Sequence, residues 1–331
     1  MTGLPTLLFI PGSWHKPSCY DKITSLLQKK HELRCISINL PSTTGNPSAT
    51  FKDDIDAARQ ALSSELSQGH NVVVIAHSYG GMVGNSAIKG LTQSQDAAKS
   101  RLIAPSSSTC IRHEDTPCDG HVIGLILIAS GFTFTGFAFM DPFFGRPPPS
   151  WRINRTTGYA ELDADPRELF YHDLSPEEAE TWTSQLTTQS LKALFEGGQY
   201  AYSGWLDVPV WYIGTTQDRG LPVIVQRMQV GMAREMGGNV EHRELQTSHS
   251  PFLSQPEQTT EIIWQAVEAF TGAPINKNPK RALRVDERIP VARFWEPMTW
   301  FRFGLPSVFG RIIGRMFLLF NGGLTLFRSK S

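Results

Sequence analysis

The chain has 331 residues, of which 40% are hydrophobic and 19% charged, and its formal net charge is zero. This composition excludes a disordered chain, and the balanced charge excludes a general electrostatic attraction to nucleic acid. The charge is uneven, however: from Lys277 onward eleven Lys and Arg stand against three Asp and Glu, a balance of +8, which leaves −8 on residues 1–276. We therefore expect one large domain over residues 1–272 and a basic, aromatic C-terminal extension over residues 273–331.

The N-terminus and the cysteines favour a cytoplasmic setting. The first apolar run stops after Ile10 and no basic region precedes it, which is typical of a first strand and not of a signal peptide. The cysteines are too few for a disulfide framework in a chain of this length: Cys19, Cys35, Cys110 and Cys118.

Short apolar runs alternate along the chain with helix-like segments, which predicts an α/β fold with a mostly parallel sheet covered by helices on both faces. The run 122–129 is apolar throughout and predicts a central strand, whereas 240–245 resembles an edge strand. The spacing of Ser254 and Glu257 predicts a capping box at the start of the last helix. We expect strands over residues 6–10, 34–40, 71–76, 122–129, 208–214 and 240–245, and helices over 17–30, 51–68, 80–91 and 255–270.

Two segments interrupt this alternation. Residues 92–121 are rich in Ser, Asp and Lys and predict a surface insertion. Residues 132–206 lack strand periodicity but contain a helix-like piece around 175–186, so we expect a small helical cap between two strands of the sheet.

The strongest functional signal is the turn Ala76-His77-Ser78-Tyr79-Gly80, which lies between a predicted strand and a glycine-rich helix. A nucleophile elbow needs small residues two positions either side of the serine, because the backbone there is strained and packs tightly. Ala76 and Gly80 meet this need, although Ala replaces the usual first glycine. A serine that merely capped a helix would not require both. Ser78 is therefore the predicted nucleophile.

A serine hydroxyl needs a base and an orienting carboxylate, which in this arrangement follow the serine on loops after later strands. Asp218 comes directly after the predicted strand 208–214 and is the expected acid. The competing Asp207 precedes that strand and would lie at the opposite end of the sheet.

The expected base is His249, which lies between the last predicted strand and the last predicted helix. His242 falls within the strand and is expected at the surface. His77 flanks Ser78 but should point elsewhere from the elbow, and His15 comes too early in the chain order.

Backbone N–H groups must stabilise the oxyanion that forms on the substrate. One donor should be Tyr79, which directly follows the nucleophile. The other should come from the loop after the first strand, where Gly12 permits a tight turn. We favour the N–H of Ser13, with Trp14 as the alternative; a Pro-Gly pair that simply ends the strand is the competing interpretation.

The motifs Pro-Gly-Ser-Trp, Ala-His-Ser-Tyr-Gly-Gly and Ser-His-Ser-Pro-Phe occur in order with Asp218 between the last two, so the chain resembles the α/β-hydrolase superfamily over about residues 5–272. It is most similar to the branch of small cofactor-free carboxylesterases that includes plant methylesterases and hydroxynitrile lyases. The resemblance implies Ser78 as nucleophile, His249 as base, Asp218 as acid, and Ser13 and Tyr79 as oxyanion donors. Pro11 departs from the His usual in that branch, and the residues after 272 have no counterpart in it.

Aromatic residues near these motifs suggest an apolar substrate pocket. Trp14 lies in the oxyanion loop, and Phe132 and Phe134 follow the expected central strand at its C-terminal end, so all three are candidate substrate contacts. The aromatic residues of the cap can equally line an acyl pocket or pack the cap onto the sheet.

Two further segments carry weaker signals. The series Cys110, His113, Cys118 and His121 contains possible zinc ligands but lacks a recognised spacing, so no metal is expected. The uncharged run 316–327 is shorter than the ~20 residues that span a bilayer. Contact of residues 298–328 with a membrane surface or a second subunit stays open.

These residues predict a cofactor-free serine hydrolase that cleaves a small to medium apolar ester, lactone or thioester through an acyl-enzyme. By analogy alone, such chains often serve secondary-metabolite pathways. One alternative is a lyase that uses the same triad as a base, although residues 207–221 lack the lysine that hydroxynitrile lyases use. The other is a non-catalytic ligand-binding protein with a decayed site.

Overall fold

The computed structural model describes residues 3–93 and 120–272, and its centre is a six-stranded sheet with the order β2-β1-β3-β4-β7-β8. Every neighbouring pair in this sheet is parallel. The sheet confirms the predicted α/β class, places the all-apolar β4 in the middle and places β8 at an edge. The strands are β1 (Thr6–Ile10), β2 (Cys35–Ser37), β3 (Val72–His77), β4 (Val122–Ile128), β7 (Val210–Thr215) and β8 (Val240–Leu245).

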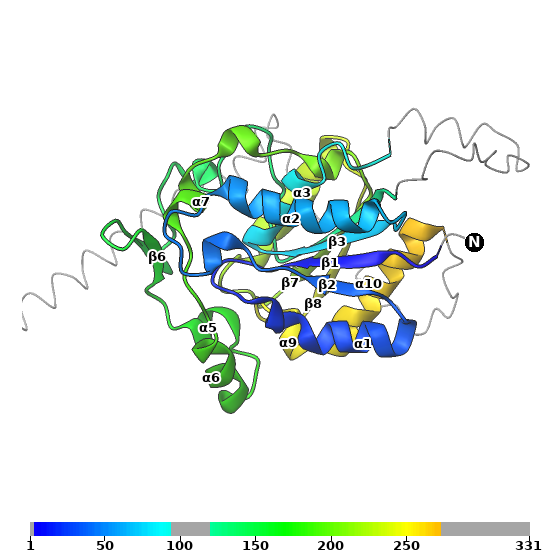
Figure 1. The fold of residues 1–331 in the computed structure, drawn as a ribbon. Helices are drawn as coiled ribbons and strands as arrows, with labels where there is room; N and C mark the ends of the chain where they lie inside the picture. Colours follow the sequence, from blue (N-terminus) through cyan, green and yellow to red (C-terminus); the bar gives the residue numbers. More distant parts are fainter. Residues whose placement is uncertain (1–2, 94–119, 273–331) are drawn as a thin grey trace, which may run out of the picture. The chain divides into compact units, whose positions relative to one another are not determined.

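Helices cover both faces of the sheet (Figure 1). On one face α2 (Phe51–Leu66) packs beside α3 (Tyr79–Ala87), and on the other α1 (Asp21–His31) packs beside α10 (Pro256–Thr271). The helix α8 (Val223–Glu235), which the apolar pattern did not reveal, connects β7 to β8.

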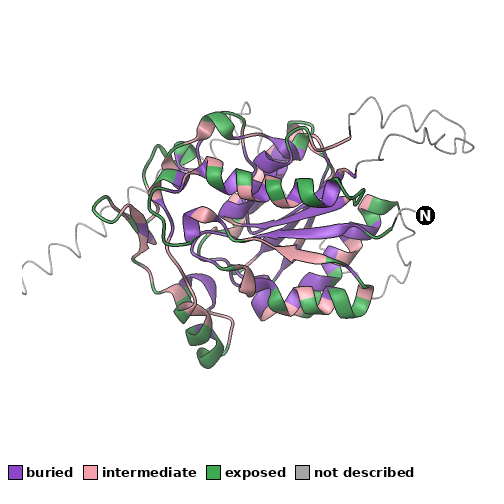
Figure 2. Cartoon of the chain, viewed as in Figure 1, coloured by how far each residue is buried: buried purple, intermediate pink, exposed green. Residues whose placement is uncertain are grey.

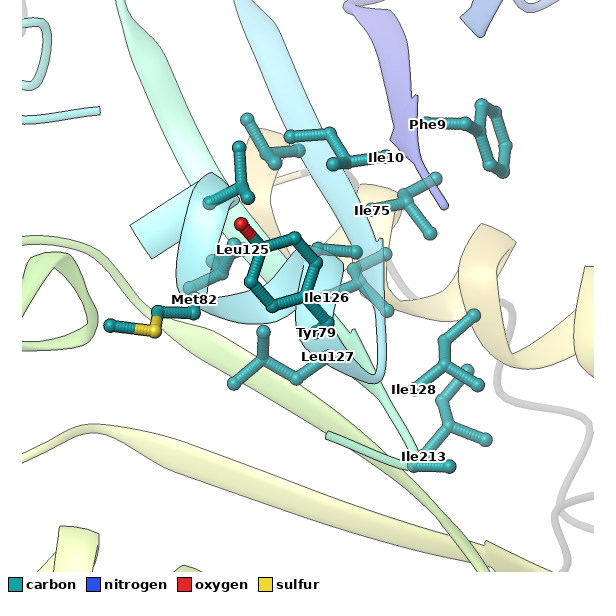
Figure 3. Close-up of a cluster of buried hydrophobic side chains, with 14 of the residues drawn as sticks. Phe9, Ile10, Ile75, Tyr79, Met82, Leu125, Ile126, Leu127, Ile128 and Ile213 are labelled. Carbon is teal, nitrogen blue, oxygen red and sulfur yellow. The ribbon is translucent and has the colours of Figure 1, made fainter. Parts of the chain in front are cut away.

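The hydrophobic core lies between the sheet and the helices on its two faces. Its central strands β1 and β3 are buried along their whole length. Figure 2 shows β1 and β3 buried, the edge strand β2 partly buried, and the outer surfaces of the helices exposed. Ile10 of β1, Ile75 of β3 and Ile126 of β4 gather in one cluster with Tyr79 of α3 (Figure 3), and all four are fully buried. Each such aliphatic side chain stabilises the fold by about 1.5–3 kcal/mol relative to an exposed one. This rigid centre holds the loops at the C-terminal ends of the strands.

Two predicted boundaries differ from the structure for identifiable reasons. The strand expected over 34–40 is shortened to β2, because only Cys35–Ser37 pair in register with Leu7–Phe9 of β1. The predicted capping box is wrong: Ser254 closes the short helix α9 (Pro251–Ser254), and its hydroxyl bonds to the Thr247 hydroxyl at 2.6 Å. Gln255 is the N-cap of α10 and makes no side-chain capping bond.

The segment expected to form a helical cap, residues 132–206, also contains a β-hairpin that the sequence did not reveal. Its strands β5 (Trp151–Asn154) and β6 (Tyr159–Leu162) pair antiparallel. Four residues a strand give too little alternation to be recognised. The turn is shaped by Asn154, whose side chain accepts bonds from two backbone N–H groups. The rest of the cap comprises η3 (Asp141–Phe143), α5 (Pro166–Phe170), α6 (Pro176–Ser184), α7 (Leu191–Phe195), η4 (Gly198–Tyr200) and η5 (Gly204–Leu206).

Most of the predicted insertion 92–121 and the whole extension 273–331 lie outside the described residues, and so does most of the Cys110 to His121 series. Within residues 3–93 and 120–272, the helices are all too short or too polar to traverse a bilayer.

Gly80 is the position in α3 where a Cβ would come closest to backbone atoms of a neighbouring segment. A Cβ there would lie 2.4 Å from Pro11 O and 2.6 Å from Ile10 O, which are backbone atoms that cannot rotate away. We expect Gly80→Ala to destabilise the fold by about 1–3 kcal/mol through overpacking, although alanine favours helix by about 1 kcal/mol. The control is Gly84→Ala, whose Cβ would meet the Val74 side chain at a milder 3.1 Å. Thermal melts that rank Gly80→Ala as the more stable variant would contradict this account.

Candidate active site

Ser78 lies at the turn between β3 and α3, with φ 50° and ψ −124°. This positive-φ conformation is strained for a residue with a side chain, and such strain persists only where packing imposes it. Gly81 permits the close approach of the loop that follows β4, because a Cβ there would lie 1.9 Å from Ser130 Oγ. The Ser130 hydroxyl in turn donates to Ser78 O at 2.6 Å. The turn is thereby fixed from the adjacent loop.

Asp218 and His249 form a buried pair at the same end of the sheet. Asp218 follows β7, His249 lies between β8 and α9, and His249 Nδ1 donates to Asp218 Oδ2 at 2.7 Å. The side chains are 0% and 4% exposed respectively. Since Nδ1 carries the proton in this bond, the neutral ring keeps Nε2 as its basic nitrogen. The sequence predicted both residues, and the structure brings them together.

Both oxygens of the Asp218 carboxylate accept several hydrogen bonds. Oδ1 accepts from the N–H groups of Gly220 and Leu221 at 2.8 and 2.7 Å, and Oδ2 also accepts from Thr215 Oγ1 at 2.7 Å. Burial alone would raise the pKa of Asp218, but the charge and hydrogen bond of His249, the Leu221 N–H and the Thr215 hydroxyl together lower it below its ordinary value. The carboxyl is therefore ionised at neutral pH.

Gln226 of α8 is a further partner of this carboxylate that the sequence gave no reason to single out. Its Nε2 donates to Asp218 Oδ2 at 3.1 Å and to Thr215 Oγ1 at 2.9 Å. Asp207, the competing acid, follows η5 and precedes β7, at the opposite end of that strand from Asp218.

The loop after β1 passes directly beside the elbow. A Cβ on Gly12 would lie 3.0 Å from Ser78 Cβ and 2.9 Å from His77 Nδ1, so only glycine fits there without displacement. Ser13 and Trp14 follow immediately, and Trp14 has φ 62°. Tyr79 begins α3, where the first N–H groups of a helix lack intrahelical acceptors. The three backbone groups predicted as oxyanion donors thus lie on segments that flank Ser78.

Two histidines that were set aside from the sequence are buried beside this site. His77 was expected to point away from the site. Its ring instead packs on His249 with ring centroids 4.6 Å apart, and its Nε2 donates to His249 O at 3.0 Å. His15 lies 5.6 Å from His77 between ring centroids. Burial lowers the pKa of His77 well below its ordinary value, and the charges of His249 and His15 lower it further. Chain order excluded both as bases but could not reveal these contacts.

The prediction that His242 lies at the surface is also wrong, since the residue is buried, with 8% of its surface exposed. It alternates inward on β8, and its ring packs edge-on against Tyr212 at 5.4 Å. Burial lowers its pKa to about 4.

The predicted substrate contacts occupy different surroundings. Trp14 donates from Nε1 to Ala160 O at 3.0 Å. Phe132 is 4% exposed and stacks on Tyr212 at 5.7 Å, whereas Phe134 is half-buried near Trp205. Their roles in substrate binding stay predictions. Among the residues the structure describes, no three His, Cys, Asp or Glu side chains gather as a metal site would require.

Asp54 of α2 links the elbow to the helix layer. It is fully buried, and it accepts from Tyr79 Oη at 2.7 Å and from the Ser42 N–H at 2.9 Å. Burial raises the pKa of Asp54 to about 6, although the hydrogen bonds from Ser42 and Tyr79 oppose this. Its carboxyl therefore holds a proton more tightly in the folded protein than in the unfolded chain.

This raised pKa predicts a pH effect on stability. The contribution of Asp54 is fully present below its unfolded pKa of about 4 and is lost as the pH rises through 6, by up to about 3 kcal/mol. Asp54→Asn removes the titration, so wild type should lose stability relative to the variant between pH 4 and pH 7. Urea denaturation of both proteins at the two pH values measures the difference. A gap between them that is independent of pH would contradict the assignment.

Comparison with known proteins agrees with this architecture. A profile described as the alpha/beta hydrolase family matches residues 7–262. The alpha/beta hydrolase nvfD of Aspergillus novofumigatus is 27% identical over 266 residues, which cover 79% of this chain and 96% of that protein.

Solved structures show the same fold. The pyrethroid hydrolase of Sphingobium faniae has a TM-score of 0.55 at 20% identity, covering 81% of this chain and 98% of its own. Polyneuridine aldehyde esterase has a TM-score of 0.55 at 17% identity, covering 80% of this chain and 99% of its own. Since the family profile spans more than half of the sequence, the chain belongs to the alpha/beta hydrolase family.

Proposed function

We propose that this protein is a serine hydrolase that cleaves a small to medium, largely apolar ester, lactone or thioester through an acyl-enzyme. The observation that carries the proposal is the buried 2.7 Å bond between His249 and Asp218 on loops at the end of the sheet where β3 delivers Ser78. A buried, fully bonded carboxylate on a histidine is the usual way to prepare that histidine as a base.

The proposed reaction has two halves, acylation and deacylation, and each catalytic group has the same role in both. His249 Nε2 takes the Ser78 hydroxyl proton as Oγ attacks the carbonyl carbon, and the carbonyl electrons move to oxygen. The resulting oxyanion accepts hydrogen bonds from the N–H groups of Tyr79 and Ser13. His249 then gives its proton to the leaving alcohol or thiol as that bond breaks. Water repeats the sequence on the acyl-enzyme, which releases the acid and restores Ser78.

An apolar substrate is supported by the rings around the base. Phe170 of the cap lies 5.6 Å from His249 between ring centroids and is itself packed on Trp14 at 6.2 Å. Two structural neighbours are named a pyrethroid hydrolase and polyneuridine aldehyde esterase. These names concern those proteins and give the substrate class to try first here.

The test is rapid-mixing kinetics with p-nitrophenyl esters from acetate to dodecanoate. We expect hydrolysis with a preference for a medium acyl chain, and a p-nitrophenol burst of about one equivalent wherever deacylation is slow. The lyase alternative predicts no acyl intermediate, and the non-catalytic alternative predicts no turnover. Absence of both turnover and burst across the series would overturn the proposal.

A further inference from the structure

The loop Gly12–His15 is fixed by hydrogen bonds to three consecutive carbonyls. Gly12 O accepts from the backbone N–H of His15 at 3.3 Å, and Ser13 O accepts from His15 Nδ1 at 2.7 Å. Trp14 O accepts from the cap residue Thr187, from N at 2.8 Å and from Oγ1 at 3.0 Å. The carbonyl groups of Gly12, Ser13 and Trp14 are therefore all occupied.

The N–H groups of the same peptides are turned the other way. In a trans peptide the C=O of one residue and the N–H of the next point in opposite directions, so the bond to Ser13 O also sets the Trp14 N–H. Within the described part of the chain, the N–H groups of Ser13 and Trp14 have no acceptor. They lie one and two residues after Gly12, whose Cα adjoins Ser78. Buried backbone donors without acceptors beside a nucleophile are the groups that an oxyanion needs.

The His15 side chain prevents rotation of the Ser13–Trp14 peptide in this loop. Trp14 has φ 62°, a conformation that a residue with a side chain rarely adopts unless its surroundings impose it. Rotation of the Ser13–Trp14 peptide would relieve the strain, but it would replace the N–H with the Ser13 carbonyl oxygen. A carbonyl oxygen in that place would repel the oxyanion instead of stabilising it. The bond from His15 Nδ1 holds the carbonyl on the opposite side.

The Ser13 carbonyl determines which nitrogen of His15 carries the proton, and Tyr171 bonds to the other nitrogen. Ser13 O can only accept, so Nδ1 must be the donor, and Nε2 then accepts from Tyr171 Oη at 2.9 Å. Both side chains are buried, at 3% and 1% exposure. Burial lowers the pKa of His15 to about 4, so the ring is neutral at neutral pH and keeps this pattern. The link runs from the cap, just after α5, to the loop beside Ser78.

We infer that His15, oriented by Tyr171, is a positioning residue that holds the Ser13–Trp14 peptide so that its N–H, which belongs to Trp14, is directed at the oxyanion beside the Ser13 N–H. The inference rests on the proposed function. It assigns no proton transfer to His15, which acts on the reaction through the backbone alone. It also makes the cap a support for the oxyanion site.

The test compares His15→Phe, His15→Asn and Tyr171→Phe with wild type, using p-nitrophenyl butyrate and the rate of Ser78 phosphonylation by a fluorophosphonate. Loss of one oxyanion donor typically costs 10²–10³ in kcat, so we expect His15→Phe to lower kcat and the phosphonylation rate by about 100-fold. KM should stay within about threefold, because substrate binding does not use this contact. His15→Asn keeps an N–H donor near the Nδ1 position, so its kcat should be about tenfold higher than that of His15→Phe. Tyr171→Phe should lose about three- to tenfold.

The control is Tyr20→Phe, which removes an equally buried hydroxyl that donates to Ile10 O on β1 at 2.9 Å. It should change kcat by less than twofold. A folded His15→Phe protein with wild-type kcat, or with only a raised KM, would overturn the inference, as would His15→Asn behaving like His15→Phe. If His15→Phe does not fold, Tyr171→Phe decides, and an unchanged kcat there overturns it. A wild-type protein that does not react at Ser78 would overturn the proposed function as well, whereas reactive wild type with indifferent variants overturns this inference alone.

Discussion

Replacing Ser78 with alanine is expected to lower kcat/KM for ester hydrolysis by about 10⁴-fold or more and to leave the fold intact. The hydroxyl is the only group proposed to bond with the substrate carbon, and His249 cannot substitute for it as a nucleophile in this geometry. The packing of the turn depends on other atoms, namely the Ser78 carbonyl and the Gly80 and Gly81 backbones. The melting temperature should therefore change little.

The matched control for this variant is Ser86→Ala, which removes a buried hydroxyl from α3, the helix that follows Ser78, where it donates to Met82 O at 2.8 Å. Its activity should remain within about twofold of wild type. Initial rates on the best p-nitrophenyl ester, together with thermal melts, give both quantities. Retention of more than a tenth of wild-type activity by Ser78→Ala would show that Ser78 is not the nucleophile.

Asp218→Asn should lower kcat about 10⁴-fold, whereas Asp207→Asn should have no effect beyond twofold. An amide at position 218 presents an N–H where Oδ2 now accepts from His249 Nδ1. His249 would then hold its proton on Nε2 and could not accept one from Ser78. Asp207 is half-buried and lies at the other end of β7, so its change leaves this geometry untouched.

The pH dependence of stability also distinguishes wild type from Asp218→Asn. The pKa of Asp218 is lowered in the folded protein, so its stabilising contribution is present above the unfolded value and is lost as the pH falls through the folded one. Wild type should therefore lose stability in acid relative to Asp218→Asn. Equal loss of activity in the two Asn variants, with both folded, would refute the choice of Asp218.

The sheet was largely predictable because most of its strands are continuous apolar runs with clear breaks after them, although the edge strand 240–245 is apolar only at its two ends. Residues 6–10 and 240–245 were predicted with the bounds the structure has. The elbow was predictable for a related reason, since its steric demands fall on neighbouring positions in the sequence. Where a requirement is local, the sequence alone expresses it.

Contacts between distant segments were not predictable in this way. The bond from His77 to His249 O spans 172 positions, and the bond from Tyr171 to His15 spans 156. Neither pair has a local pattern that separates it from ordinary buried residues. Gln226 was missed with the whole of α8, and the β5–β6 hairpin was missed because its strands are so short. The supporting groups around the candidate triad therefore required the structure.

The central claim, that Ser78 is a reactive nucleophile served by His249 and Asp218, is tested most directly by mapping a covalent adduct. The native protein is treated with a fluorophosphonate, digested and analysed by tandem mass spectrometry, beside His249→Ala as a matched sample. The account predicts a single phosphonyl group on Ser78, formed at least about 100-fold more slowly when His249 is replaced. An adduct on another serine, no adduct at all, or labelling of Ser78 at the same rate without His249 would contradict it.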